Sequence, residues 1–316
     1  MPLIAYKPKR FNDTSCEMIS KINEVISTYQ EQGFDLTLRQ VYYQMVARGI
    51  IPNTDSEYKK LGCLISDARL AGLIDWYSIE DRTRGLRGNT HWNSPGDIIA
   101  AASNQYAIDK WTDQGYYVEV WVEKDALSGI VSSACEPLDV NYFSCRGYVS
   151  QSEMWLAAQR FMDRAVTYGQ KCVILHLGDH DPSGIDMSRD IEARIRLFWT
   201  HHYLSDAATD PDESFIFHRI ALNWDQIQRY TPPPNPTKLS DSRALSYLQQ
   251  FGSQCWELDA LEPSVIVQLI SMHVNLRCDR KLFTRQKQKE ADERDALTSV
   301  SANWPTVVAR LEKGGD

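Results

Sequence analysis

The chain has 316 residues, of which 43% are hydrophobic and 24% are charged, and this composition excludes a disordered or fibrous protein. No apolar run is long enough for a signal peptide or a membrane span, so we expect a cytoplasmic protein that does not associate with membranes. Seven cysteines without a Cys-x-x-Cys pair indicate reduced thiols and no zinc framework. The length predicts two domains, each with its own core.

The net charge of -8 argues at first against nucleic acid, because DNA affinity comes largely from Lys and Arg that neutralise phosphates. Residues 1–95 nevertheless hold 12 basic and 11 acidic side chains, and residues 231–316 hold 11 of each. Residues 96–230 hold 11 basic and 20 acidic side chains. The acidic excess therefore lies in the middle segment, where a cation site would need it.

Three short helices are predicted in the N-terminal part. Apolar positions recur at helical spacing over residues 13–32 and then stop. Thr37 is an expected N-cap for a second helix that runs to Arg48, and a capping-box pattern at residues 54–57 opens a third helix that ends near Gly72. Three short helices with tight connections indicate a helix-turn-helix core.

A basic loop follows these helices. Residues 74–79 favour a short strand pair, and residues 81–88, Asp-Arg-Thr-Arg-Gly-Leu-Arg-Gly, favour a flexible loop that serves as the wing of a winged-helix domain over residues 1–92. The residues expected to contact DNA phosphates are Lys59 and Lys60 on the third helix and Arg82, Arg84 and Arg87 in the wing. Each of them alone is equally explained as a solvated surface charge.

The second half of the chain alternates between strand and helix patterns. Residues 93–112 are predicted to form a linker helix, and residues 113–316 a second domain with a C-terminal extension. Residues 117–122 and 172–177 are rich in β-branched residues, with a helical stretch at residues 151–168 between them. This alternation predicts a mainly parallel α/β sheet. The expected fold class is therefore α+β with two domains.

Three carboxylates follow the two predicted strands. Glu123 comes directly after the first strand, and Asp179 and Asp181 come directly after the second, at the ends where parallel sheets place their ligands. Because side chains two apart share a strand face, we expect Asp179 and Asp181 to project to the same side. Oxygen ligands without accompanying Cys or His suit Mg²⁺. The alternative is that each acid only caps the next helix, with Pro182 at its first position.

A tyrosine and an arginine share one face of the second predicted helix. Apolar residues recur at i, i+3, i+4 and i+7 from Leu38, which places Tyr42 in the buried stripe. Tyr43 lies about 100° away and is expected to be exposed on the same face as Arg39. Ionising a phenol at pH 7 costs about 4 kcal/mol, which Arg39 and a Mg²⁺ ion would offset if the phenol attacks a phosphate. The alternative is an exposed aromatic without a function.

Four motifs in chain order are together more specific than any one of them. They are Arg39-Gln-Val-Tyr-Tyr43, Trp121-Val-Glu-Lys-Asp-Ala126, Ser144-Cys-Arg-Gly-Tyr148 and Leu177-Gly-Asp-His-Asp-Pro-Ser-Gly184. With these motifs the chain resembles the A subunit of topoisomerase VI and its meiotic double-strand-break relatives, and in length it is closest to their stand-alone "mini-A" type proteins. The segment Trp256-Glu-Leu-Asp-Ala-Leu-Glu-Pro263 is similar to one that follows the family's Toprim core.

The resemblance implies roles for particular residues. Tyr43 matches the family's transesterifying tyrosine, and Arg39 matches its neighbouring arginine. Glu123, Asp179 and Asp181 match the carboxylates of the Toprim magnesium site, with Glu123 also counted among the catalytic residues. In this family two A chains form a homodimer on double-stranded DNA, in which the tyrosine of one protomer works with the metal site of the other and stays attached to the 5′ end.

The implied activity is Mg²⁺-dependent DNA cleavage of the type IIB topoisomerase kind, with Lys124 of the second motif expected to contact DNA. Strand passage would need a separate GHKL-type ATPase subunit, because the chain has no recognisable ATPase domain. The loop at residues 144–149 replaces the family's more usual Gly-Lys-Gly-Tyr-Pro style of loop. Two alternatives stay open: a Toprim nuclease that hydrolyses DNA through metal-activated water, and a non-catalytic DNA-binding or partner-recruiting module.

Overall fold

The structure is a computed structural model that describes residues 3–80, 91–203, 214–237, 241 and 243–313. Its N-terminal part contains three helices, α1 (Asp13–Gln30), α2 (Leu38–Ala47) and α3 (Asp55–Leu70). The predicted caps are confirmed: Thr37 and Gln40 form a reciprocal capping box on α2, and the Thr54 side chain accepts the Glu57 N–H of α3. The apolar faces of the three helices form one buried cluster.

The strand predicted at residues 74–79, the described part of the expected strand pair, is mostly wrong. The strand β2 contains only Ile79–Glu80 and pairs in parallel with β1 (Leu36–Thr37). The turns before it are held by Arg69, whose guanidinium donates to the carbonyls of Trp76 at 3.1 Å and Ile79 at 2.7 Å. The predicted wing residues Arg82, Arg84 and Arg87 lie outside the described residues.

The predicted linker helix is shorter than expected. Helix α4 spans Pro95–Gln105, begins with Pro at its first turn after the N-cap Ser94, and does not continue to residue 112. Beyond it, backbone N–H groups bond to distant side chains: Ile108 donates to Glu290 at 2.9 Å and Lys110 donates to Asp139 at 2.9 Å. These contacts replace the helical hydrogen bonds that local sequence alone would favour.

A four-stranded sheet forms the centre of the second half, and all of its strands are parallel, as predicted. Its order is β4-β3-β5-β6. The strands are β3 (Tyr116–Val122), β4 (Asn141–Ser144), β5 (Lys171–Leu177) and β6 (Phe215–Ala221). Parallel strands with helices between them make the chain an α+β protein with a doubly covered sheet.

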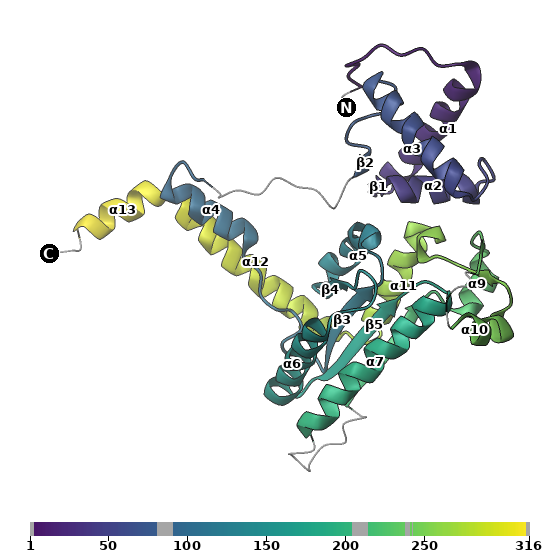
Figure 1. The fold of residues 1–316 in the computed structure, drawn as a ribbon. Coiled ribbons are helices and arrows are strands. Elements are labelled where there is room, and N and C mark those ends of the chain that lie inside the picture. Colours follow the sequence, from purple (N-terminus) through teal and green to yellow (C-terminus); the bar gives the residue numbers. More distant parts are fainter. Residues whose placement is uncertain (1–2, 81–90, 204–213, 238–240, 242, 314–316) are drawn as a thin grey trace.

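Helices cover both faces of this sheet (Figure 1). One face packs against α5 (Ser128–Cys135) and α11 (Pro263–Asn275). The other face packs against α6 (Gln151–Tyr168) and α7 (Pro182–Tyr203). Alternate residues of β3 point to opposite layers, with Val118 in the first cluster and Tyr117 in the second. Burial on both faces leaves the carboxyl ends of the strands as the accessible edge.

The remaining described elements lie around this core or, for α12 and α13, extend away from it. They are η1 (Asp125–Leu127), η2 (Glu136–Leu138), α9 (Trp224–Tyr230), β7 (Asn235–Pro236), α10 (Ala244–Phe251), β8 (Gln254–Cys255), η3 (Leu258–Ala260), α12 (Arg280–Ala302) and α13 (Trp304–Lys313). Within the described ranges no helix has both the length and the apolar character needed to cross a lipid bilayer.

The N-terminal helices rest on the segment that follows the sheet. Helix α2 contacts η3, and Ala260 of η3 belongs to the buried cluster of the N-terminal helices. The Tyr29 hydroxyl donates to Glu262, and the Asn53 amide donates to Asn235. These contacts fix the face of α2 that carries Arg39 and Tyr43 against the carboxyl edge of the sheet.

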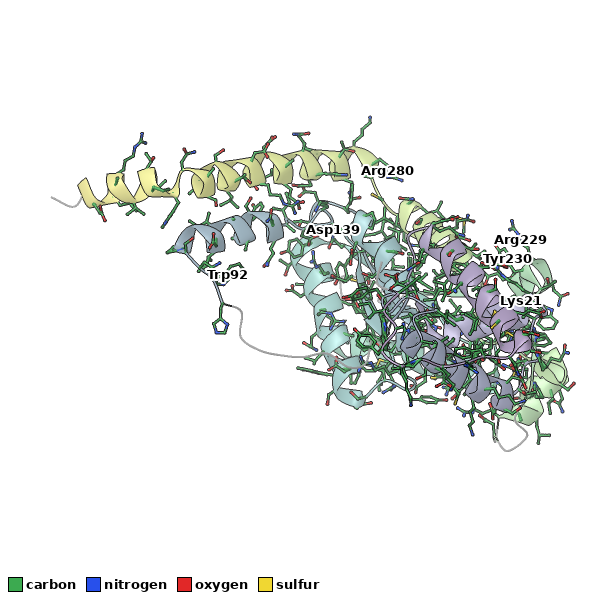
Figure 2. All side chains as sticks on the ribbon, turned by 90° about the horizontal axis from the view of Figure 1, so that it is seen from above. Lys21, Trp92, Asp139, Arg229, Tyr230 and Arg280 are labelled. Atoms are coloured by element: carbon green, nitrogen blue, oxygen red, sulfur yellow. The ribbon has the colours of Figure 1, made fainter. Side chains whose placement is uncertain are left out.

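Helices α4 and α12 form an arm that leaves this body. In Figure 2, α12 departs at Arg280 and runs outward with α4 beside it. Polar contacts join the two helices: the hydroxyls of Ser103 and Thr298 lie 2.7 Å apart, and the hydroxyl of Tyr106, at the end of α4, donates to the Glu293 carboxylate at 2.5 Å. The base of the arm is anchored by the Lys110 ammonium on Glu290 at 2.6 Å.

The buried His176 predicts a pH dependence of stability. Burial, with a smaller effect of Arg219, lowers the pKa of His176 to about 3. Below pH 6.5 His176 is therefore largely protonated in the unfolded chain but stays neutral in the folded chain. The free energy of unfolding should fall by about 2 kcal/mol between pH 7 and pH 5 from this residue. Urea unfolding should show this loss in the wild type and not in His176→Gln, and an equal loss in both would contradict the assignment.

Candidate active site at the carboxyl edge of the sheet

Glu123, Asp179 and Asp181 lie at the carboxyl ends of β3 and β5, as expected from the sequence. Glu123 follows β3 directly and is buried, and one of its oxygens, Oε2, accepts the backbone N–H of Asp179 at 2.8 Å. Asp179 is also buried, whereas Asp181 is partly exposed. The parallel sheet thus brings together carboxylates that are 56 residues apart in the chain.

Asp179 and Asp181 have different partners in the structure, and the expectation that they project to the same side stays a prediction. Strand β5 ends at Leu177, and the chain then turns into α7. Asp181 Oδ1 accepts the Gly184 N–H at 2.6 Å, which is the helix-capping alternative. Asp179 Oδ2 instead pairs with the Lys124 ammonium at 2.9 Å. Within the described residues no three His, Cys, Asp or Glu side chains are arranged to hold a metal ion.

The same carboxylates still fit a divalent cation in charge and in donor type. Burial raises the pKa of Glu123, and nearby Asp181 raises it further. Burial likewise raises the pKa of Asp179, with Glu123 and Asp259 adding to the effect. Like charges held this close repel each other, and a bound cation relieves that repulsion. Asp179 would have to exchange Lys124 for the ion.

Glycine at position 184 allows this close approach. A Cβ atom there would lie 2.3 Å from the Asp179 carbonyl oxygen and 3.0 Å from Glu123 Oε2. We expect Gly184→Ala to force the loop apart and to lower the free energy of unfolding by about 1–3 kcal/mol. The control is Gly115→Ala, because nothing lies within 4 Å of a Cβ at Gly115. Urea unfolding of both variants checks this, and equal stability would contradict the packing described.

Lys124 lies inside a group of three carboxylates. Its ammonium is 2.9 Å from Asp179, 2.8 Å from Glu257 and 3.0 Å from Asp259. Burial opposes the charge of Lys124, but the three carboxylates outweigh it and raise the pKa. Its side chain is only 19% exposed and neutralises acids of the protein itself, so the expected contact of Lys124 with DNA stays a prediction that would require Lys124 to exchange a carboxylate for a phosphate.

Tyr43 is buried, which corrects the expectation of an exposed phenol. Its exposed fraction is 5%, against 4% for Tyr42, whose assignment to the core is confirmed. Burial raises the pKa of the Tyr43 phenol, and the neighbouring Glu257 carboxylate raises it further. The face of α2 predicted to meet solvent is covered by residues more than 200 positions later in the chain.

Arg39 lies beside Tyr43, as predicted, and faces the same acidic segment. Its guanidinium is 2.7 Å from Glu257 and 3.2 Å from Asp259 and lies 5.8 Å from the centre of the Tyr43 ring. Burial opposes the charge of Arg39, but Glu257 and Asp259 prevail and raise its pKa. A permanently charged guanidinium therefore accompanies the phenol.

A cavity of about 710 Å³ connects the two sets of residues. Arg39 and Tyr43 line it from α2, and Asp181 and Glu257 line it from the sheet side. A continuous series of contacts also runs from Tyr43 through Glu257 and Lys124 to Asp179. The candidate nucleophile and the acidic group of one chain thus lie at the same place.

Sequence reasoning missed three residues of this site. Glu257 and Asp259 are two apart in the Trp-Glu-Leu-Asp segment, a spacing that could have marked them as a second acidic pair. Arg219 of β6 is partly buried and donates to the carbonyls of Gly178 at 2.9 Å and Asp179 at 2.6 Å. It also donates to the carbonyl of Gly184 at 3.2 Å. Arg219 thus binds both ends of the loop that carries the carboxylates. No pattern in the sequence around residue 219 predicted this role.

Lys59 and Lys60 are exposed on α3, as their predicted role requires. Lys60 forms a surface ion pair with Glu57 at 2.6 Å, one turn earlier in the helix. Exposed pairs of this kind contribute little to stability, so the ammonium can exchange its carboxylate for a phosphate at small cost.

Comparisons of the chain with protein-family models, curated proteins and solved structures found no match. What the cavity can do therefore follows from its side chains. A phenol, a guanidinium and a set of carboxylates provide a nucleophile, a fixed cation for developing charge, and oxygen ligands for a divalent ion. These are the parts that phosphoryl transfer requires.

Proposed function

We propose that the chain cleaves DNA by tyrosine transesterification in the manner of the topoisomerase VI A family, to which its motifs are similar. The observation that carries the proposal is the convergence of Tyr43, Arg39 and the carboxylates of Asp181 and Glu257 on one cavity of about 710 Å³. In this proposal residues 1–92 form a winged-helix domain, and the sheet belongs to a Toprim domain within residues 113–316. The protein acts on double-stranded DNA as a homodimer.

The residues divide the reaction between them. The Tyr43 hydroxyl attacks the scissile phosphorus, and Arg39 stabilises the negative charge that develops on the phosphate oxygens. Glu123, Asp179 and Asp181 would hold a magnesium ion, which would polarise the scissile phosphate. The 3′ oxygen of the DNA leaves, and the 5′ phosphate remains on the tyrosine. The covalent link preserves the energy of the phosphodiester, so the break can be resealed.

The fold supports the assignment of the DNA-binding parts. Lys59 and Lys60 are exposed on α3, the helix that follows the tyrosine helix, where phosphate contacts would position DNA without reading its sequence. The motif resemblance implies that two chains pair, and in this proposal each tyrosine serves the carboxylates of its own chain. Strand passage by such a dimer would use a separate GHKL-type ATPase subunit.

Cleavage of supercoiled plasmid tests the proposal. The protein should convert plasmid to linear and nicked forms with Mg²⁺ and not with EDTA, and the DNA ends should stay bound to protein until a protease is added. Ends free of protein would instead favour hydrolysis by metal-activated water. An absence of Mg²⁺-dependent cleavage would favour a non-catalytic DNA-binding or partner-recruiting module.

A further inference from the structure

The proposed reaction needs an acceptor for the proton of the attacking phenol. A tyrosine with a pKa near 10 is protonated at pH 7, and removing that proton before attack costs about 4 kcal/mol. We propose that Glu257 accepts the proton of Tyr43 as the phenol attacks the phosphate. This inference rests on the proposed function and extends it, because neither the motifs nor their family resemblance gives Glu257 a role.

The contacts of Glu257 carry the inference. The Arg39 guanidinium, which lies 5.8 Å from the centre of the Tyr43 ring, binds Glu257, and Tyr43 lines the same cavity, so the phenol proton has an acceptor beside it in the carboxylate of Glu257. The Asn235 amide donates to its Oε1 at 3.3 Å, and its Oε2 is shared by Arg39 at 2.7 Å and Lys124 at 2.8 Å. Asn235, Arg39 and Lys124 thus fix the carboxylate beside Tyr43, and the carboxylate also lines the cavity that the phosphate would enter.

The two cations keep Glu257 a weak base while the cavity holds no phosphate. Burial opposes its charge, but Lys124, Tyr43 and Arg39 together lower its pKa to about 2. A phosphate that enters the cavity offers oxygens to the same cations. Asp259 also binds both cations, Arg39 at 3.2 Å and Lys124 at 3.0 Å. Arg39 and Lys124 can therefore exchange Glu257 for the phosphate and still remain paired with Asp259. Glu257 is then freed to act as a base.

The step balances without any additional reactant. The bond from the Tyr43 oxygen to phosphorus forms, the bond from phosphorus to the 3′ oxygen breaks, and the phenol proton passes to the Glu257 carboxylate. The 3′ oxygen takes a proton from water, and Glu257 later releases its own to solvent. Several titratable and charged groups surround Glu257. From α2 they are Arg39, Tyr43 and the more distant Tyr42; from the other elements they are Lys124 after β3, Cys255 of β8 and Asp259 of η3.

The decisive variant is Glu257→Gln, which keeps an oxygen as hydrogen-bond acceptor but cannot take a proton. The rate of covalent adduct formation on supercoiled plasmid with Mg²⁺ should fall about 10²–10⁴-fold at pH 7. Between pH 6 and pH 9 this rate should rise about tenfold per pH unit, because only the ionised phenol reacts, whereas the wild-type rate should rise less steeply. An unchanged rate, or a uniform fall with the wild-type pH profile, would overturn the inference.

The matched control is Glu262→Gln. Glu262 binds Tyr29 across the same contact between the N-terminal helices and the sheet side but has no part in the proposed reaction. Its adduct rate should stay within about twofold of the wild type, with the same pH profile, as expected for a substitution away from the reacting groups. A fall as large as that of Glu257→Gln would assign the effect to the interface and overturn the inference.

A second measurement separates the contact from the reaction. Fluorine NMR of 3-fluorotyrosine-labelled protein, with Tyr43→Phe to assign the signal, follows the ionisation of Tyr43. The signal should titrate at lower pH in Glu257→Gln than in the wild type, because a neighbouring carboxylate disfavours the phenolate. An unshifted titration overturns the inference. A shifted titration in a protein that forms no adduct would contradict the proposed function and leave the contact standing.

Discussion

Replacing Tyr43 with phenylalanine should abolish the covalent protein–DNA adduct. The ring of Tyr43 lies 5.3 Å from that of Tyr42 and 5.8 Å from the Arg39 guanidinium, and phenylalanine preserves this packing. Only the hydroxyl is lost, and with it the atom that attacks the phosphate. Loss of a nucleophile removes the covalent route entirely, so adduct formation should fall by about 10⁴-fold or more.

The control for this variant is Tyr29→Phe. Tyr29 is also buried, and its hydroxyl donates to a carboxylate, that of Glu262, in the contact between the N-terminal helices and the sheet side. This substitution should lower the free energy of unfolding by about 1 kcal/mol and leave the adduct yield unchanged. If Tyr43→Phe cuts supercoiled DNA as well as the wild type does, the role given to the tyrosine is wrong.

The second large effect is expected for Glu123→Gln. Glutamine retains an oxygen that can accept the Asp179 N–H, which Glu123 binds at 2.8 Å, so the loop should keep its shape. The charge that attracts a divalent ion is lost. Cleavage at fixed Mg²⁺ should fall by at least about 10²-fold, and calorimetric titration with Mg²⁺ should show weaker binding than in the wild type.

Asp125→Asn is the matched control, because Asp125 lies two residues later and forms an exposed ion pair with Arg146 at 3.2 Å. Its removal should leave both cleavage and Mg²⁺ binding unchanged. Equal Mg²⁺ binding by Glu123→Gln and the wild type would show that the ion, if it acts, binds elsewhere.

Local signals in the sequence predicted the helices and strands well. Thr37 and Thr54 cap the helices that they were expected to cap, and the helix predicted at residues 151–168 has those bounds. Capping and periodicity depend on residues within one or two turns of each other, so the sequence contains them in readable form. The parallel sheet followed from the alternation of such elements.

The errors arise where distant parts of the chain meet. Periodicity placed Tyr43 on an exposed face, but that face is covered by Glu257, more than 200 residues later. The predicted linker helix ends at Gln105. Beyond that residue the Ile108 N–H donates to the side chain of Glu290 and not to a carbonyl one helical turn earlier. The pairing of Asp179 with Lys124 was also not foreseen. None of these partners can be recognised from the neighbouring sequence.

Identifying the residue that carries DNA is the most direct test of the proposed function. The protein is incubated with supercoiled plasmid and Mg²⁺, the DNA is digested with nuclease, and the peptides are analysed by mass spectrometry. The account predicts a nucleotide linked through a phosphate to Tyr43 and to no other residue. A nucleotide on a different side chain, or cleaved DNA with no modified peptide, would contradict it.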